Sequence, residues 1–150
     1  MSLKAMIMAA GVGSRLDPLT QDVPKPLVPI ANKPMMDILF DRLLSLGVKD
    51  VIANTHYKAE KIAERYKKGY KDINFNYIYE ETLSGTAGGV KKCQYFFDEG
   101  EDFLVLSADG LSNADLEKAL HSHKSSGAVA TLGIKKIAME EIPNFGVVVT

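Results

Sequence analysis

Small and cationic residues follow the first apolar run of the chain, and these residue types could bind phosphate. Residues 9–16 read Ala-Ala-Gly-Val-Gly-Ser-Arg-Leu. Glycine lets a backbone come close to a ligand, and consecutive N–H groups in such a turn can bind phosphate oxygens. Arg15 adds a planar set of donors that matches phosphate geometry. Two standard phosphate motifs are missing from the sequence, because it has neither the Gly-Lys-Ser/Thr of a P-loop nor the third glycine of the dinucleotide motif.

A stiff loop with one lysine continues this segment. Prolines stand at positions 18, 24, 26 and 29, and they reduce the entropic cost of ordering a long loop. Lys25 lies between two of them, so the sequence predicts an extended backbone there. A cation on a rigid segment can hold an anion with little reorganisation. The same pattern also fits a solvated lysine on an ordinary surface loop.

Two later segments also place polar groups directly after strand-like runs. Residues 80–89 read Glu-Glu-Thr-Leu-Ser-Gly-Thr-Ala-Gly-Gly and lead into a helix, with Ser84 or Thr86 as its candidate cap. Residues 107–110 read Ser-Ala-Asp-Gly, and an aspartate in that place often caps a turn. Taken alone, both segments fit ordinary loop-to-helix and strand-to-turn junctions.

The elements that must position these segments alternate between strand and helix. Strands are predicted at residues 5–10, 48–53, 75–79, 103–106, 128–134 and 146–149; helices are predicted at 34–46, 58–68, 86–97 and 114–124. Gly47 and Gly69 end the first two helices, and Asn113 is the candidate cap of the last. This alternation predicts an α/β fold with a mainly parallel sheet and helices on both faces, a three-layer sandwich.

Ligands of such sheets bind beyond the carboxyl ends of the strands. Four loops should lie there, at residues 11–25, 54–56, 80–88 and 107–110. Three of them carry the groups described above. The loop at 54–56 is predicted to carry no chemistry, because a single histidine after a strand, here His56, is more often structural.

Composition narrows the function classes. The 150 residues fit one domain, and 46% hydrophobic with 25% charged residues indicates a globular protein. A net charge of −1 gives no general attraction to nucleic acid or to an anionic membrane, so neither is expected as a partner. Cys93 is the only cysteine and is predicted to fill apolar space. No long apolar run is present at the start or elsewhere, so we expect a cytoplasmic protein.

Residues 11–34 together resemble the signature of the sugar-1-phosphate nucleotidylyltransferases, also called nucleotide-sugar pyrophosphorylases. The likeness is to members of the mannose-1-phosphate guanylyltransferase or glucose-1-phosphate thymidylyltransferase type. The matching residues are the glycine turn, Arg15-Leu16, Pro18-Leu19-Thr20, Pro24-Lys25-Pro26-Leu27 and Pro34. The resemblance implies a Rossmann-like nucleotide-diphospho-sugar transferase fold. It also implies a reaction in which a sugar 1-phosphate attacks the α-phosphorus of a nucleoside triphosphate and pyrophosphate leaves.

The resemblance assigns roles to residues at matching positions. Arg15 and Lys25 are implied as catalytic, and Asp109 as the ligand of Mg²⁺. Nucleotide binding is implied for Ala10, Gly11, Gly13, Ser14, Glu80, Gly85 and Thr86, and a place near the sugar for Gly146. We further hypothesise that Glu80 accepts hydrogen bonds from guanine and so favours GTP, since a carboxylate only accepts. The family usually has glycine before the metal-binding aspartate, where this chain has Ala108.

The chain matches only the first part of a typical family member. Residues 1–150 are therefore predicted to be its N-terminal, nucleotide-binding part. The sugar-binding remainder, with a Glu-Lys-Pro segment and a second metal-binding aspartate, is not in this sequence. We expect such a fragment to bind nucleotide at most and not to turn over alone. A homo-oligomer is compatible with this interpretation.

Three other function classes share features with this sequence. A cytidylyltransferase acting on a non-sugar phosphate would share the fold. A non-catalytic subunit that senses nucleotide sugars would keep the fold and lose the cations, so Arg15 and Lys25 argue against it. A dinucleotide-dependent oxidoreductase would need an acidic residue at the end of the second strand, where the chain has Asn54-Thr55-His56.

Overall fold

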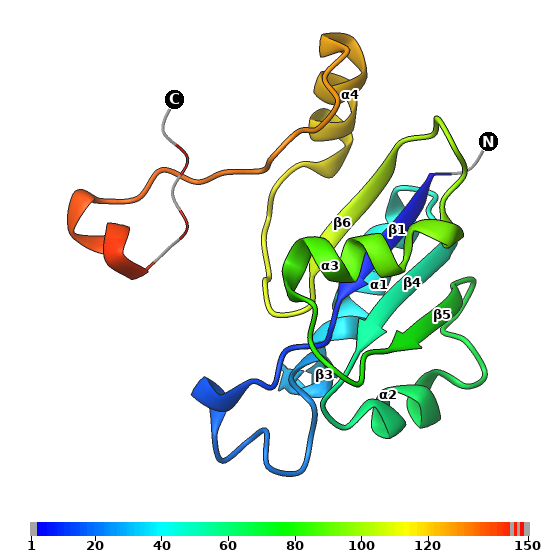
Figure 1. Ribbon diagram of the computed structural model, residues 1–150, viewed down its shortest axis with the longest axis vertical. Helices are drawn as coiled ribbons and strands as arrows, with labels where there is room; N and C mark the ends of the chain where they lie inside the picture. Colours follow the sequence, from blue (N-terminus) through cyan, green and yellow to red (C-terminus); the bar gives the residue numbers. More distant parts are fainter. Residues whose placement is uncertain (1–2, 145, 147, 149–150) are drawn as a thin grey trace. The chain divides into compact units, whose positions relative to one another are not determined.

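A computed structural model describes residues 3–144, 146 and 148 of the chain. It divides into two compact units, residues 1–112 and residues 113–150. The first unit contains a sheet of four parallel strands in the order β5-β4-β1-β6 (Figure 1). These strands are β1 Lys4–Met8, β4 Asp50–Thr55, β5 Asn74–Tyr79 and β6 Phe103–Ser107. A two-stranded antiparallel hairpin is formed by β2 Pro29–Ile30 and β3 Lys33–Pro34.

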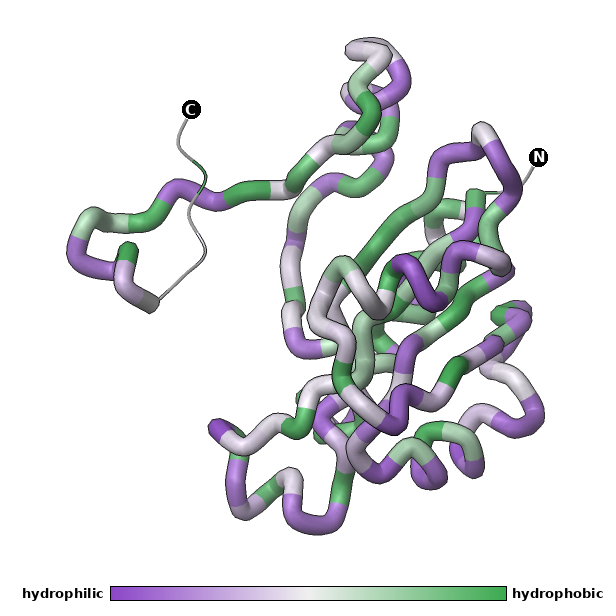
Figure 2. The backbone as a smooth tube through the Cα atoms, in the orientation of Figure 1, coloured by the Kyte–Doolittle hydropathy of each residue, from purple (hydrophilic) through white to green (hydrophobic). Residues whose placement is uncertain are grey.

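Helices cover both faces of the sheet, because the strands are apolar on both sides. On one face, α1 Met35–Ser45 and α2 Ala59–Tyr66 pack through Phe40, Leu43 and Ile62. On the other face, α3 Gly85–Lys92 and the segment after it cover Met6 and Ile52 (Figure 1). Figure 2 shows hydrophobic residues along the central strands. The predicted α/β, three-layer arrangement around a mainly parallel sheet is confirmed.

The ends of two helices and the burial of Cys93 agree with the predictions from the sequence. Gly47 and Gly69 adopt left-handed backbone angles, with φ of 76° and 77°, just past α1 and α2. Glycine has no Cβ to clash in this conformation, which explains why both helices end there. Cys93 is fully buried with Met6 and Ile52, as predicted. Burial raises the pKa of its thiol to about 11, so it is a packing residue.

Two helix predictions need correction. The helix expected over residues 86–97 is α3 followed by a separate 3-10 turn, η3 Gln94–Phe96. Ser84 stands at the N-cap position of α3, but its hydroxyl donates to Glu80 and caps no N–H of the helix among the described residues. In the second unit, α4 spans Leu116–Ser126, and its cap is Asp115. Asn113 was the wrong choice, because the Asp115 carboxylate accepts from the Lys118 N–H at 2.9 Å.

The strand predicted at residues 128–134 is also wrong. These residues pair with no strand in the described part of the chain, and Val129, Leu132 and Ile134 are exposed. An apolar β-branched run becomes a strand only where a partner offers a hydrogen-bonding edge. A 3-10 segment, η4 Met139–Asn144, follows. The strand predicted at 146–149 falls partly outside the described residues and stays a prediction.

Candidate functional site

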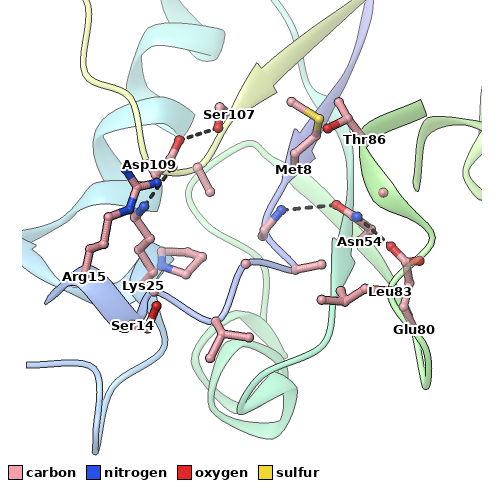
Figure 3. A pocket seen from close by; sticks show the side chains of 18 residues that line it. Met8, Ser14, Arg15, Lys25, Asn54, Glu80, Leu83, Thr86, Ser107 and Asp109 are labelled. Atoms are coloured by element: carbon pink, nitrogen blue, oxygen red, sulfur yellow. Dashed lines mark hydrogen bonds and ion pairs between the residues drawn. The ribbon is translucent and has the colours of Figure 1, made fainter. Parts of the chain in front are cut away.

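A pocket of about 400 Å³ lies at the carboxyl end of the sheet in the first unit, a volume typical of small-molecule sites. Ten predicted site residues line it: Ala10, Gly11, Gly13, Ser14, Arg15, Lys25, Glu80, Gly85, Thr86 and Asp109. Figure 3 shows Arg15, Lys25 and Asp109 on one side and the Glu80 region on the other. Gly146 belongs to the second unit and is not among the lining residues.

The loop after β1 is held in shape by local hydrogen bonds. Gly13 has φ of 76° and precedes a 3-10 turn, η1 Ser14–Leu16. The buried side chain of Thr20 donates to the Gly13 carbonyl at 3.0 Å and also lies 3.0 Å from an Asp17 carboxylate oxygen. The turn therefore presents Ser14 and Arg15 at the pocket edge without relying on a ligand to order it.

A Gly13→Ala variant should be destabilised by about 1–3 kcal/mol. The new Cβ would lie 3.0 Å from Thr20 Cγ2 and 3.1 Å from Lys25 Cβ, and φ is left-handed there. Urea unfolding of the two proteins measures the difference. Gly11→Ala is the matched control, because no described heavy atom beyond its chain neighbours lies within 4 Å of its added Cβ. Equal midpoints for the two variants would contradict this explanation of Gly13.

The charged side of the pocket contains an ion pair between Lys25 and Asp109. Lys25 Nζ lies 2.7 Å from Asp109 Oδ2, and the Ser107 hydroxyl donates to the other carboxylate oxygen. Lys25 and then Ser107 hold the pKa of Asp109 below its ordinary value, so this carboxyl is ionised at neutral pH. Arg15 is exposed and lines the same pocket.

The backbone of Lys25 differs from the prediction. Instead of being extended, it begins a 3-10 turn, η2 Lys25–Leu27. Pro26 is tolerated at the second position of that turn because its missing N–H would have no partner there. The turn is closed by the Val28 N–H, which donates to the Lys25 carbonyl at 3.2 Å. The lysine is still held rigidly, by a turn rather than by an extended segment.

On the opposite side, Glu80 is buried and accepts four hydrogen bonds. It is 1% exposed. Oε1 accepts from Asn54 Nδ2 at 2.7 Å; Oε2 accepts from the Ser84 N–H at 3.1 Å, the Ser84 hydroxyl, and Lys92 Nζ at 2.9 Å. Burial alone would raise its pKa, but the bonds from Ser84, Asn54 and Lys92 outweigh burial and lower the pKa to about 2.

Asn54 and Ser107 line the pocket and were not predicted as site residues. Asn54 is the buried one. It ends the apolar run of β4, is 6% exposed, and lines the pocket, although the loop at 54–56 was predicted to carry no chemistry. A signal was available in the sequence, since a polar amide at the carboxyl end of a buried strand must find partners. Its two partners lie 45 and 26 residues away, and the sequence does not reveal them.

Asp109 is the metal ligand that the sequence resemblance implies. No group of three or more histidine, cysteine, aspartate or glutamate side chains suited to a metal ion occurs among the described residues.

Within residues 3–144, 146 and 148, no helix is long and apolar enough to cross a membrane.

Comparison with known proteins gives the chain its family. The model of the nucleotidyl transferase family matches residues 4–150. A UTP–glucose-1-phosphate uridylyltransferase of Synechocystis sp. is 36% identical over 99% of this chain and 41% of its own length. A D-glycero-alpha-D-manno-heptose 1-phosphate guanylyltransferase of Aneurinibacillus thermoaerophilus is 35% identical over 99% of this chain and 63% of its own length.

Solved structures agree. The crystal structure of HddC from Yersinia pseudotuberculosis, complexed with GMP-PN, superposes with a TM-score of 0.71 and 30% identity. The match covers 81% of this chain and 54% of that one. Across the three relatives, the chain spans from about two fifths to somewhat less than two thirds of the relative's own length. The family match extends over nearly all of the chain and includes every strand and loop that lines the pocket. This chain therefore belongs to the nucleotidyl transferase family.

Proposed function

We propose that this chain is the nucleotide-binding part of an enzyme that makes a nucleotide sugar and pyrophosphate from a nucleoside triphosphate and a sugar 1-phosphate. The observation that carries the proposal is the convergence of Arg15, Lys25, the glycine turn and Asp109 in one pocket. The names of the relatives support it, since they are uridylyl- and guanylyltransferases for sugar 1-phosphates. The sugar-binding remainder of the proposed enzyme would lie outside these 150 residues.

In the proposed reaction the protein positions groups and neutralises charge, and no covalent intermediate on the protein is needed. The backbone N–H groups of the glycine turn bind phosphate oxygens. The guanidinium of Arg15 steadies the departing pyrophosphate, and the ammonium of Lys25 stabilises charge at the reacting phosphates. For Lys25 to do so, its ion pair with Asp109 must exchange for contacts to the ligand.

The donor set around Asp109 fits Mg²⁺. Its carboxylate is ionised, 43% exposed at the pocket edge, and supplies hard oxygen ligands. Mg²⁺ is usually bound by one or two carboxylates together with substrate phosphates and water, so a single protein carboxylate suffices. We propose that Asp109 holds the ion, which when bound would neutralise charge on the phosphates.

An Asp109→Asn variant should largely abolish the effect of magnesium on nucleotide binding. Without metal, the freed Lys25 ammonium should bind GTP about tenfold more tightly than in wild type, because its carboxylate partner is gone. With Mg²⁺ the variant should gain little affinity. Calorimetric titration with and without Mg²⁺ measures both values. Asp102→Asn, in the loop before β6 and outside the pocket lining, is the control. A variant that keeps the wild-type magnesium dependence would remove Asp109 from the metal site.

The nucleotide is tested by melting the protein with Mg²⁺ and each of GTP, dTTP, UTP, CTP and ATP. A ligand that binds only the folded state raises the melting temperature. We propose that GTP gives the largest rise and that Glu80 selects it through Oε1, which among the described residues accepts one hydrogen bond, from Asn54. A Glu80→Gln variant that retains the same ranking would refute this role of Glu80. If no nucleotide raises the melting temperature, the proposed binding site is wrong for this chain.

We also propose that the protein acts in the cytoplasm. The support is chemical: the single cysteine is a buried free thiol packed in the core, which suits a reducing compartment.

A further inference from the structure

Asn54 occupies the centre of the pocket edge of the sheet. It lies near the end of β4, which pairs with β1 on one side and β5 on the other. In register it stands beside Met8 and Ile78. The loop that follows β1 forms the phosphate side of the pocket, and the loop that follows β5 forms the opposite side. Asn54 is therefore placed between the two loops (Figure 3).

Its side-chain amide touches both loops at once. Oδ1 accepts from the Ala9 N–H at 3.1 Å, a donor that also contacts the Asn54 carbonyl at 3.2 Å. Nδ2 donates to Glu80 Oε1 at 2.7 Å. Asparagine offers one acceptor and one donor on a single short group, which aspartate and leucine do not. Because the amide is buried, a lost partner is not readily replaced by water.

The helix after the second loop is fitted to this amide. A Cβ added to Gly89 of α3 would lie 2.6 Å from Asn54 Nδ2 and 3.3 Å from Glu80 Oε1. Gly89 is therefore required so that the helix backbone can approach the Asn54–Glu80 pair. The same Glu80 carboxylate binds the N–H and hydroxyl of Ser84. Leu83, Gly85 and Thr86, which flank Ser84, line the pocket.

We propose that Asn54 is a positioning residue that fixes the two walls of the nucleotide pocket relative to each other. In this proposal Asn54 does not contact the reacting phosphates. It acts through its hydrogen bonds to Ala9 and Glu80. A nucleoside triphosphate must use both walls at once, so its affinity depends on their spacing. A ligand that consists only of phosphates contacts one wall, so its affinity does not depend on the spacing of the two walls. This inference rests on the proposed function, because it assumes that the pocket binds a nucleotide.

The test compares two ligands on the same protein. In Asn54→Ala, the affinity for GTP with Mg²⁺ should fall about tenfold, the equivalent of one buried hydrogen bond, while the affinity for inorganic tripolyphosphate stays unchanged. If wild type prefers another of the five nucleotides, that nucleotide replaces GTP. A purely structural role of Asn54 would lower the affinities for GTP and for tripolyphosphate by the same factor. Asn76→Ala, at an exposed position of β5 and outside the pocket, is the matched control.

A second variant keeps the test decisive if Asn54→Ala folds poorly. Gly89→Ala displaces the amide without removing it and should show the same selective loss of GTP affinity. Hydrogen exchange of the ligand-free proteins adds an independent measurement. The peptide covering residues 81–88 should exchange about threefold or more faster in Asn54→Ala, and at the wild-type rate in Asn76→Ala.

Two kinds of failure are distinguishable. Equal loss for GTP and tripolyphosphate, or unchanged exchange at residues 81–88, would overturn the positioning role and leave the proposed function standing. Wild-type protein that binds none of the nucleotides would overturn the proposed function, and the inference with it.

Discussion

Replacing Lys25 with methionine is expected to weaken binding of GTP with Mg²⁺ by about a hundredfold, since removing one member of a close charge pair typically costs 2–5 kcal/mol. The variant removes the ammonium proposed to contact the phosphates. It also leaves the ionised Asp109 carboxylate facing an anionic ligand without its partner at 2.7 Å. Methionine is unbranched like lysine and only one heavy atom shorter, so packing around the turn at Pro26 should change little. Calorimetric titration gives the two dissociation constants.

Lys67→Met is the control for this experiment. Lys67 also forms an ion pair, with Glu64, but both side chains are more than half exposed and neither lines the pocket. Its affinity for GTP should equal that of wild type, because an exposed pair contributes little. A Lys25 variant that binds GTP as tightly as this control would mean that the lysine only stabilises the ligand-free loop.

The second large effect concerns stability in acid and follows from Glu80. Its pKa is about 2 in the folded chain, against 4.5 when unperturbed. The pKa is depressed, so the stability it contributes is complete above about pH 5 and is lost as pH falls toward 2. The shift corresponds to about 3 kcal/mol for this buried group. Urea unfolding of wild type at pH 7, 5, 4 and 3 should therefore show a steep loss of unfolding free energy.

The variant Glu80→Gln separates this effect from other acidic groups. It has no charge to lose, so its unfolding free energy should fall less over the same pH range. Asp41 also has a pKa of about 2, lowered chiefly by Lys33 and Lys71, but it is present in both proteins and cancels in the comparison. Parallel pH profiles for the two proteins would show that the bonds around Glu80 do not stabilise its charge.

Much of the fold could be predicted because its signals are local. Apolar runs marked β1 and β4, and the left-handed glycines after α1 and α2 mark where each helix ends. The pocket was predictable as well, since parallel strands bring their carboxyl ends to one edge. The wrong N-cap prediction for α4, which is off by two residues, also concerns a local signal. Asn113 and Asp115 both suit a cap, and only the backbone decides that Asp115 takes that place.

Other features depend on partners that are far apart in sequence. Residues 128–134 have strand composition, but composition does not supply the edge that a strand must pair with. The sequence predicted that Glu80 faces the base, but it did not predict which residues bind the Glu80 carboxylate. Asn54 lies on another strand, and Lys92 lies a helix away. The four hydrogen bonds that this carboxylate accepts, and the link that Asn54 makes to the first loop, follow only from the folded arrangement.

The proposed nucleotide site is tested most directly by the electron density of a crystal of this chain soaked with Mg²⁺ and the nucleotide that most raises its melting temperature. We predict triphosphate density against residues 11–15 and Lys25, a metal ion at the Asp109 carboxylate, and base density against residues 83–86. Density with the base beside Asp109, or a nucleotide bound anywhere outside this pocket, would contradict this prediction.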